Sequence, residues 1–156
     1  MNMPVIRDLP IKRPSWSGHY TAEIVRHEVK GLLRRKVPIL AIGINRDFPL
    51  VLHSQDGCSY RAAWRFESDM GSIPSLVQTL RVPYLSLQRD CFPRSYILHD
   101  SGYREHGLWT PDGHNGWEFK RLTRDKVDRL LYEGLQAEGA NLIERELIYL
   151  GVRWGG

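Results

Sequence analysis

An imidazole, a carboxylate and a phenol lie close together in the sequence, at His99, Asp100 and Tyr103. On a helix, residues four positions apart share a face, so His99 and Tyr103 would lie side by side while Asp100 points roughly 100° away. An unperturbed histidine is mostly a free base at neutral pH and can accept a proton from a reacting group. The spacing therefore allows an acid–base site, although a structural His–Asp pair is the commoner meaning of such a pattern.

Two further carboxylates could take part in such a site. Asp128 lies directly beside the apolar stripe of a predicted helix, so its side chain could point from the edge of the core toward another helix. Asp69 follows the last predicted strand, a usual place for ligands, but an aspartate in a turn more commonly accepts hydrogen bonds from backbone N–H groups. Each of these two residues is a site candidate with an ordinary structural alternative.

Three helices are predicted in the second half of the chain, and two of them carry the candidate residues. Pro93 opens a helix over about 94–104, since proline is well tolerated in a first helical turn. Thr123 is a typical N-cap for a second helix that ends at Gly139. The last helix is expected over Asn141–Trp154. The residues predicted to be buried are Val127, Leu130, Leu131 and Leu135 in the second helix, and Ile143, Leu147, Leu150 and Trp154 in the last.

The middle of the chain predicts a small antiparallel sheet. Continuous apolar runs at 38–43 and 49–53 are typical of short strands, and the turn at 54–57 contains an Asp-Gly pair of the kind that favours hairpins. The run 60–67 alternates, so one set of side chains should face the core and the other the solvent. The core set is Tyr60, Ala62, Trp64 and Phe66, and the solvent set is Arg61, Arg65 and Glu67.

The remaining segments are less regular. Prolines favour an extended arm over residues 1–20. The apolar positions of 21–35 fit a helical stripe, so a helix is predicted there, with a strand as the alternative because several of these residues are β-branched. A short helix is expected at 72–77. The turn-rich loop 110–116 could be a lid, a partner-contacting surface or a loop anchored to the core by the aromatic residues that flank it, which are Trp109, Trp117 and Phe119.

Length and composition bound the class of protein. The 156 residues predict a single α+β domain over 21–156, a small antiparallel sheet followed by three packed helices, preceded by the arm. No apolar run is long enough to span a bilayer and no secretory signal is visible, so synthesis in the cytoplasm is expected. Two cysteines are too few for a disulfide scaffold. Basic residues between 12 and 36 could favour phosphate groups of nucleic acid or lipid, but a solvated basic face is the commoner explanation.

Four short motifs, in order, resemble the phage and bacterial domain-of-unknown-function family 1353. They are Ser68–Pro74, Ile97–Tyr103, Val127–Leu131 and Leu147–Arg153. That family typically shows Asp-x-x-Ser-Ile-Pro, Leu-His-Asp-x-x-Tyr, Ala-Asp-x-x-Phe and Tyr-x-x-Val-Arg at these places, and Val and Leu here replace its Ala and Phe. The similarity spans about residues 60–156. It implies a phage or prophage origin, often in virion or tail gene regions, without an established activity.

The His-Asp-x-x-Tyr helix with a remote aspartate is also similar to the site of secreted and viral phospholipases A2. That resemblance implies His99 as the base that activates water, Asp128 as the carboxylate that orients it, and Tyr103 as hydrogen-bonding support. It also implies Asp100 as a calcium ligand, and a hard cation there could stabilise a developing oxyanion. A glycine-rich calcium loop is not recognisable, and the segment that begins at Asp69 is the candidate substitute.

Three functions follow as alternatives. The first is a virion-associated protein of tail, baseplate or neck type, made in the host cytoplasm, with a hydrolase-like His/Asp site that could bind calcium. The second is a purely structural or adaptor virion component in which the same residues form a buried polar clamp. The third is a lysis-associated hydrolase of lipid or cell wall. Expected partners are other virion proteins or further copies of the chain, with a membrane or cell-envelope substrate as an option; nucleic acid is not expected.

Overall fold

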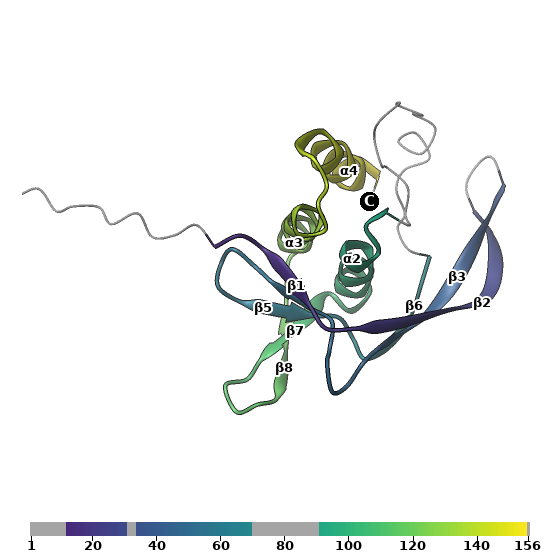
Figure 1. Cartoon of the computed structure of the whole chain (residues 1–156). Coiled ribbons are helices and arrows are strands. Elements are labelled where there is room, and N and C mark those ends of the chain that lie inside the picture. Colours follow the sequence, from purple (N-terminus) through teal and green to yellow (C-terminus); the bar gives the residue numbers. More distant parts are fainter. Residues whose placement is uncertain (1–11, 31–33, 70–90, 156) are drawn as a thin grey trace, which may run out of the picture.

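A computed structural model describes residues 12–30, 34–69 and 91–155 of the chain. Two antiparallel sheets and three helices make up this part of the molecule (Figure 1). No helix in these ranges is long and apolar enough to cross a membrane. The elements in chain order are β1 (Ser15–Ser17), β2 (Tyr20–Lys30), β3 (Arg35–Ile44), β4 (Val51–His53), β5 (Ser59–Arg61), β6 (Arg65–Ser68), α2 (Pro93–Glu105), β7 (Gly107–Pro111), β8 (Trp117–Arg121), α3 (Arg124–Ala137) and α4 (Leu142–Gly155).

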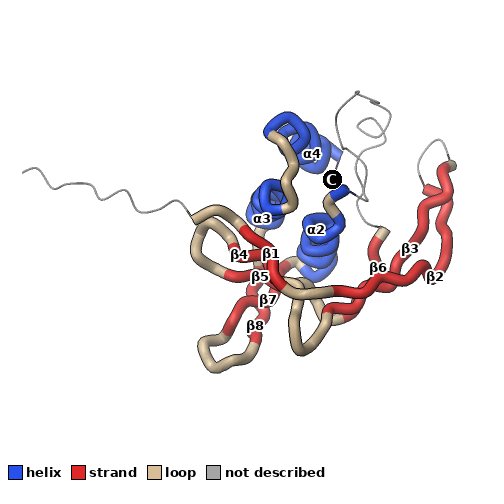
Figure 2. The backbone as a smooth tube through the Cα atoms, in the orientation of Figure 1, coloured by secondary structure: helices blue, strands red, loops and turns tan. Residues whose placement is uncertain are grey.

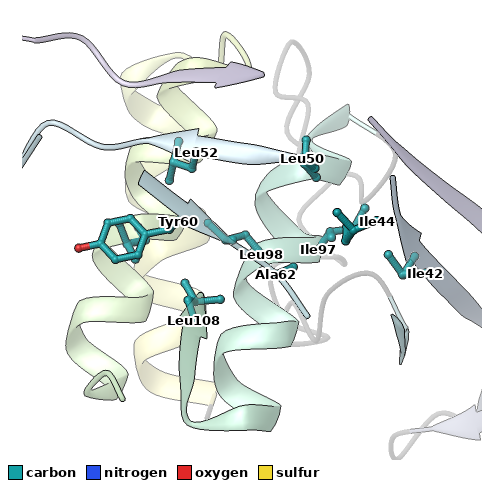
Figure 3. Close-up of a cluster of buried hydrophobic side chains, with 10 residues drawn as sticks. Ile42, Ile44, Leu50, Leu52, Tyr60, Ala62, Ile97, Leu98 and Leu108 are labelled. Carbon is teal, nitrogen blue, oxygen red and sulfur yellow. The ribbon is translucent and has the colours of Figure 1, made fainter. Parts of the chain in front are cut away.

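The five-stranded sheet has the order β1-β4-β5-β7-β8, and α2 and α3 lie against one of its faces (Figure 2). The other sheet has the order β2-β3-β6. Side chains from both sheets and from the two helices form the main core (Figure 3). The predicted α+β class is confirmed, and the β7–β8 hairpin lies between α2 and α3 in the chain. The buried members of this core are Ile42, Ile44, Leu50, Leu52, Tyr60, Ala62, Ile97, Leu98, Leu108 and Leu130.

Local signals predict α2 and α3 correctly, and Pro93 lies in the first turn of α2 as expected. The carboxylate of Glu138 accepts hydrogen bonds from the backbone N–H groups of Arg94 and Ser95, at 3.0 and 2.9 Å, and so caps the start of α2 from the far end of α3. The hydroxyl oxygen of Thr123 accepts a backbone N–H of the first turn of α3 at 3.2 Å, as expected for its N-cap. All four apolar residues predicted to be buried in α3 are buried.

The predicted buried face of the last helix is wrong except at Leu147, which is partly buried and packs on the core beside this helix. In α4 the buried apolar side chains are Ile148 and Val152, whereas Ile143 is 60% exposed and Trp154 is 87% exposed. This helix carries apolar residues on more than one side, so helical periodicity alone fits two faces equally well. Packing on α3 and on the second core selects the face that contains Ile148. That second core consists of Phe92, Tyr96, Leu131, Leu135, Ala140, Ile148 and Val152.

The helix predicted over 21–35 is also wrong, because β2 is a strand that pairs antiparallel with β3 along its whole length. The register shifts between Ile24 and Arg26. Residues 31–33 lie outside the described ranges. The apolar positions that fit a helical stripe do not form a buried stripe, since Ile24, Val25 and Val29 are 60%, 50% and 54% exposed. Their β-branched side chains favour an extended backbone once a neighbouring strand offers hydrogen bonds.

The predicted strands at 38–43 and 49–53 are present in β3 and β4. The turn after β4 forms the predicted hairpin with β5, closed by a hydrogen bond of 2.9 Å from the N–H of Ser54 to the carbonyl of Cys58. The predicted strand at 60–67 is instead two short strands, β5 and β6, which belong to different sheets. The short helix predicted at 72–77 lies outside the described residues.

Arg61, predicted to face water, is fully buried. Its guanidinium carbon lies 3.6 Å from the ring centroid of Trp64, and 4.9 and 5.2 Å from those of Trp117 and Trp109. These aromatic faces replace water around the charge. Burial lowers the pKa of Arg61 to about 10. Alternation along β5 assigns residues to two faces of the sheet, but it does not show that tryptophans from β7, β8 and the segment after β5 cover the outer face.

Candidate functional site

The structure brings His99 of α2 and Asp128 of α3 into contact. The imidazole Nε2 lies 3.1 Å from Oδ1 of Asp128, and the two residues are only 8% and 2% exposed. The helices approach closely at Gly102, where an added Cβ would lie 2.8 Å from a methyl group of Val127. A glycine one turn after the histidine therefore allows the aspartate of the facing helix to reach the imidazole.

Tyr103 and Arg153 complete the surroundings of Asp128. The phenol of Tyr103 donates to the same Oδ1 at 2.6 Å, and its ring lies against His99 with a centroid separation of 4.3 Å. The guanidinium of Arg153, on α4, lies 3.5 Å from the other carboxylate oxygen and 2.9 Å from Asp125. One buried carboxylate thus holds groups from α2 and α4 against α3. We call His99, Tyr103, Asp128 and Arg153 the Asp128 cluster.

Asp100 adjoins this cluster on the other edge of the imidazole. Its Oδ1 lies 3.8 Å from Nδ1 of His99, and its other oxygen accepts a short hydrogen bond from the hydroxyl of Ser68 at the end of β6. Its side chain is 18% exposed. A separation of 3.8 Å is too long for a direct hydrogen bond, but one water molecule can bridge such a gap. The Nδ1 edge of the imidazole therefore adjoins a partly buried carboxylate.

Asp69, the other predicted calcium ligand, has Lys30 of β2 as its partner at 2.8 Å. Within the described ranges, no group of three or more His, Cys, Asp or Glu side chains could hold a metal ion. The residues that follow Asp69 in its turn lie outside those ranges. Carboxylate oxygens are the donors that calcium prefers, but Asp69 and Asp100 are already engaged by an ammonium group and by a hydroxyl, respectively. Calcium binding stays a prediction.

The charges of the cluster shift the pKa values of its members in opposite directions. Burial alone would lower the pKa of His99, but the negative charges of Asp100 and Asp128 beside the ring outweigh it and raise the pKa above 6.5. Burial alone would raise the pKa of Asp128, yet hydrogen bonds from His99 and Tyr103 lower it below 3.8. Burial and the same carboxylate raise the pKa of Tyr103. Both shifts favour an imidazolium beside a carboxylate, so the fraction of free base at neutral pH is lower than for an unperturbed histidine.

Sequence reasoning identified three of the four members of the Asp128 cluster, but it assigned no role to Arg153. The available signal was its place in the fourth motif, one residue after the buried Val152 of α4. It also missed Ser68, which belongs to the first motif and contacts Asp100. Ser68, Asp128 and Arg153, one residue from each of the other three motifs, therefore lie next to His99 or to one of its two carboxylate neighbours, although they lie far apart in the sequence.

The comparisons with known proteins add no relative. No family model, no curated protein and no solved structure matches this chain. The resemblances drawn from the short motifs stay predictions.

Proposed function

We propose that this chain is a structural or adaptor component of a phage virion, of tail, baseplate or neck type. The phage context comes from the four motifs. The observation that carries the assembly role is β2, an exposed edge strand that extends away from the helices with β3 (Figure 1). The Asp128 cluster then serves as a polar clamp that holds α2, α3 and α4 in place.

The strands β2 and β3 together, which we call the β2–β3 arm, have the properties of an assembly surface. Soluble proteins usually keep edge strands short or cover them, because the unpaired backbone N–H and C=O groups of a long edge recruit further strands. β2 is 11 residues long, and Ile24, Val25 and Val29 on it are each at least half exposed. Apolar side chains next to unpaired backbone groups favour contact with another protein.

The burial and the occupied hydrogen-bonding groups of the Asp128 cluster support a structural role and argue against a catalytic one. His99 is almost fully buried, and both oxygens of Asp128 face donors from other helices. A carboxylate in this position stabilises the packing only as long as all its partners remain. The clamp would thus fix the three helices behind the sheets while the arm stays free to bind.

Purified phage particles test this proposal. Quantitative mass spectrometry of particles should find the chain in a fixed number of copies, and Val25→Ser/Val29→Ser should reduce its incorporation. The variant Lys120→Glu, on the exposed edge strand β8, is the matched control. A chain found only in the lysate and never in particles would contradict the virion assignment.

A hydrolase-like site is the second candidate, and one observation favours it. Asp128 holds Nε2 of His99, while Nδ1 lies 3.8 Å from Oδ1 of Asp100, too far for a direct hydrogen bond. In such a site His99 would act as the base above its raised pKa, with Asp100 as a ligand for calcium. Hydrolysis of phospholipid or cell-wall esters that requires calcium and disappears in His99→Ala would support it. Equal rates in the variant and the native chain would exclude it.

A further inference from the structure

The outer edge of β2 has no strand partner among the described residues, because β2 is the terminal strand of the sheet β2-β3-β6. The strand has one irregularity, at Ile24/Arg26, and is regular from Arg26 to Lys30. Regular backbone is what an additional strand requires, whereas a bulge limits how far pairing extends. The segment that begins at Arg26 is therefore the place where a further strand fits.

Side chains of this segment alternate between a charged face and an uncharged one. Arg26, Glu28 and Lys30 share a face, as their mutual ion pairs and those with the neighbouring strand show. Arg26 contacts Glu28 at 2.9 Å and Glu67 of β6 at 2.8 Å. His27 and Val29 point to the opposite face. Along the charged face the sign changes at every step, from positive to negative to positive.

We propose that a second copy of this chain pairs with β2 in antiparallel orientation, with His27 of each copy at the two-fold axis. This inference rests on the proposed assembly role and names its first partner. In that register Arg26 of each copy lies opposite Glu28 of the other. Two opposite-charge pairs form within the regular segment, and the free β2 edges of both copies disappear into one continuous sheet.

Charge complementarity selects this register over its neighbours. The two-fold axis of an antiparallel pair is perpendicular to the sheet, so it keeps each residue of the two copies on the same face. Directly opposed side chains must also share a face, so each allowed register is centred on one residue of β2. Centring the pair on Arg26 places two guanidinium groups opposite each other, and centring it on Glu28 opposes two carboxylates. Of these three registers, only the one centred on His27 opposes unlike charges. A two-fold contact uses the same surface of both copies, so the assembly closes as a dimer.

Charge reversal tests the pairing in the full chain. Sedimentation analysis should show a dimer for the native chain, and Arg26→Glu or Glu28→Arg alone should raise the dimer dissociation constant by roughly tenfold or more, because each places like charges opposite in two pairs. The double variant Arg26→Glu/Glu28→Arg restores unlike pairs and should return the dissociation constant toward the native value. Lys120→Glu on β8 should leave it unchanged. A native chain that stays monomeric, or single reversals without effect, or a double variant as weak as the single ones, would overturn the proposal.

A disulfide trap tests the register. The exposed Cys58 and Cys91 are first replaced by serine. His27→Cys in that background should then form a covalent dimer on mild oxidation, since directly opposed residues of antiparallel strands lie within disulfide reach. Thr21→Cys, on the same strand but far from the axis, should not. Equal cross-linking at both positions would overturn the register.

The dimer and the virion assignment fail separately. A chain that is present in particles yet monomeric contradicts the proposed dimer alone, whereas a dimer that is absent from particles contradicts the virion assignment alone.

Discussion

The Asp128 cluster and the β2–β3 arm differ in whether their polar groups have hydrogen-bond partners and whether their apolar side chains are buried. The cluster is closed, since the buried carboxylate of α3 receives donors from two other helices, α2 and α4, and His99 is only 8% exposed. The arm is open, with apolar side chains in solvent and backbone groups at a sheet edge. The difference indicates that one region maintains the fold and the other is left for a partner. Substitutions in the two regions should therefore affect different measurements.

Removing the carboxylate at the centre of the cluster should have the largest effect on stability. Asp128→Ala leaves His99, Tyr103 and Arg153 without their common partner, and breaking a buried ion pair costs about 3–5 kcal/mol. Urea unfolding measures the loss. Asp125→Ala is the matched control on the same helix, because its exposed ion pairs contribute at most about 1 kcal/mol. Similar losses for both variants would show that burial of Asp128 has no energetic consequence.

Removing one donor should have a smaller effect. Tyr103→Phe deletes the hydroxyl that donates to Asp128 at 2.6 Å while keeping the ring against His99. A hydrogen bond to a charged group contributes about 1.5–3 kcal/mol, and the expected loss lies at the low end because the ring packing remains. The same unfolding experiment measures it. A stability equal to that of the native chain would place the phenol outside the clamp.

The clamp should also make stability depend on pH in two directions. The pKa of His99 is raised in the folded state, so its contribution is complete below the unfolded value of 6.5 and is lost as pH rises through the folded pKa. The pKa of Asp128 is lowered, so its contribution is complete above 3.8 and is lost as pH falls through the folded pKa. Unfolding free energy measured across pH should fall at both ends, and Asp128→Asn should flatten the profile. A profile that keeps its shape in this variant would assign the dependence to other groups.

The arm should show the smallest effect on stability. Val29→Ser changes a residue that is 54% exposed, so the free energy of unfolding at low protein concentration should change by no more than about 0.5 kcal/mol. Association between chains should weaken at the same time. A large loss of stability from this substitution would remove the contrast between a closed cluster and an open arm.

Sequence patterns predicted the elements whose signals are local. The N-cap and buried stripe of α3 follow from Thr123 and its apolar spacing, and placing His99 and Asp128 on facing helices anticipated their contact. Patterns failed where the surroundings decide the outcome. Periodicity assumes that apolar residues are buried, an assumption that β2 violates with Ile24 and that α4 violates with Trp154. The position of the Asp128 cluster was therefore more predictable than the surfaces around it.

The most direct measurement of the central claim is the titration of the His99 imidazole by NMR in the intact chain. The chain has six histidines, so the resonance is assigned by its disappearance in His99→Gln. We expect a pKa above 6.5 in the native chain and a lower one in Asp128→Asn, because the carboxylate stabilises the imidazolium. A native pKa at or below 6.5, or one that Asp128→Asn leaves unchanged, would contradict a charged clamp between the two helices.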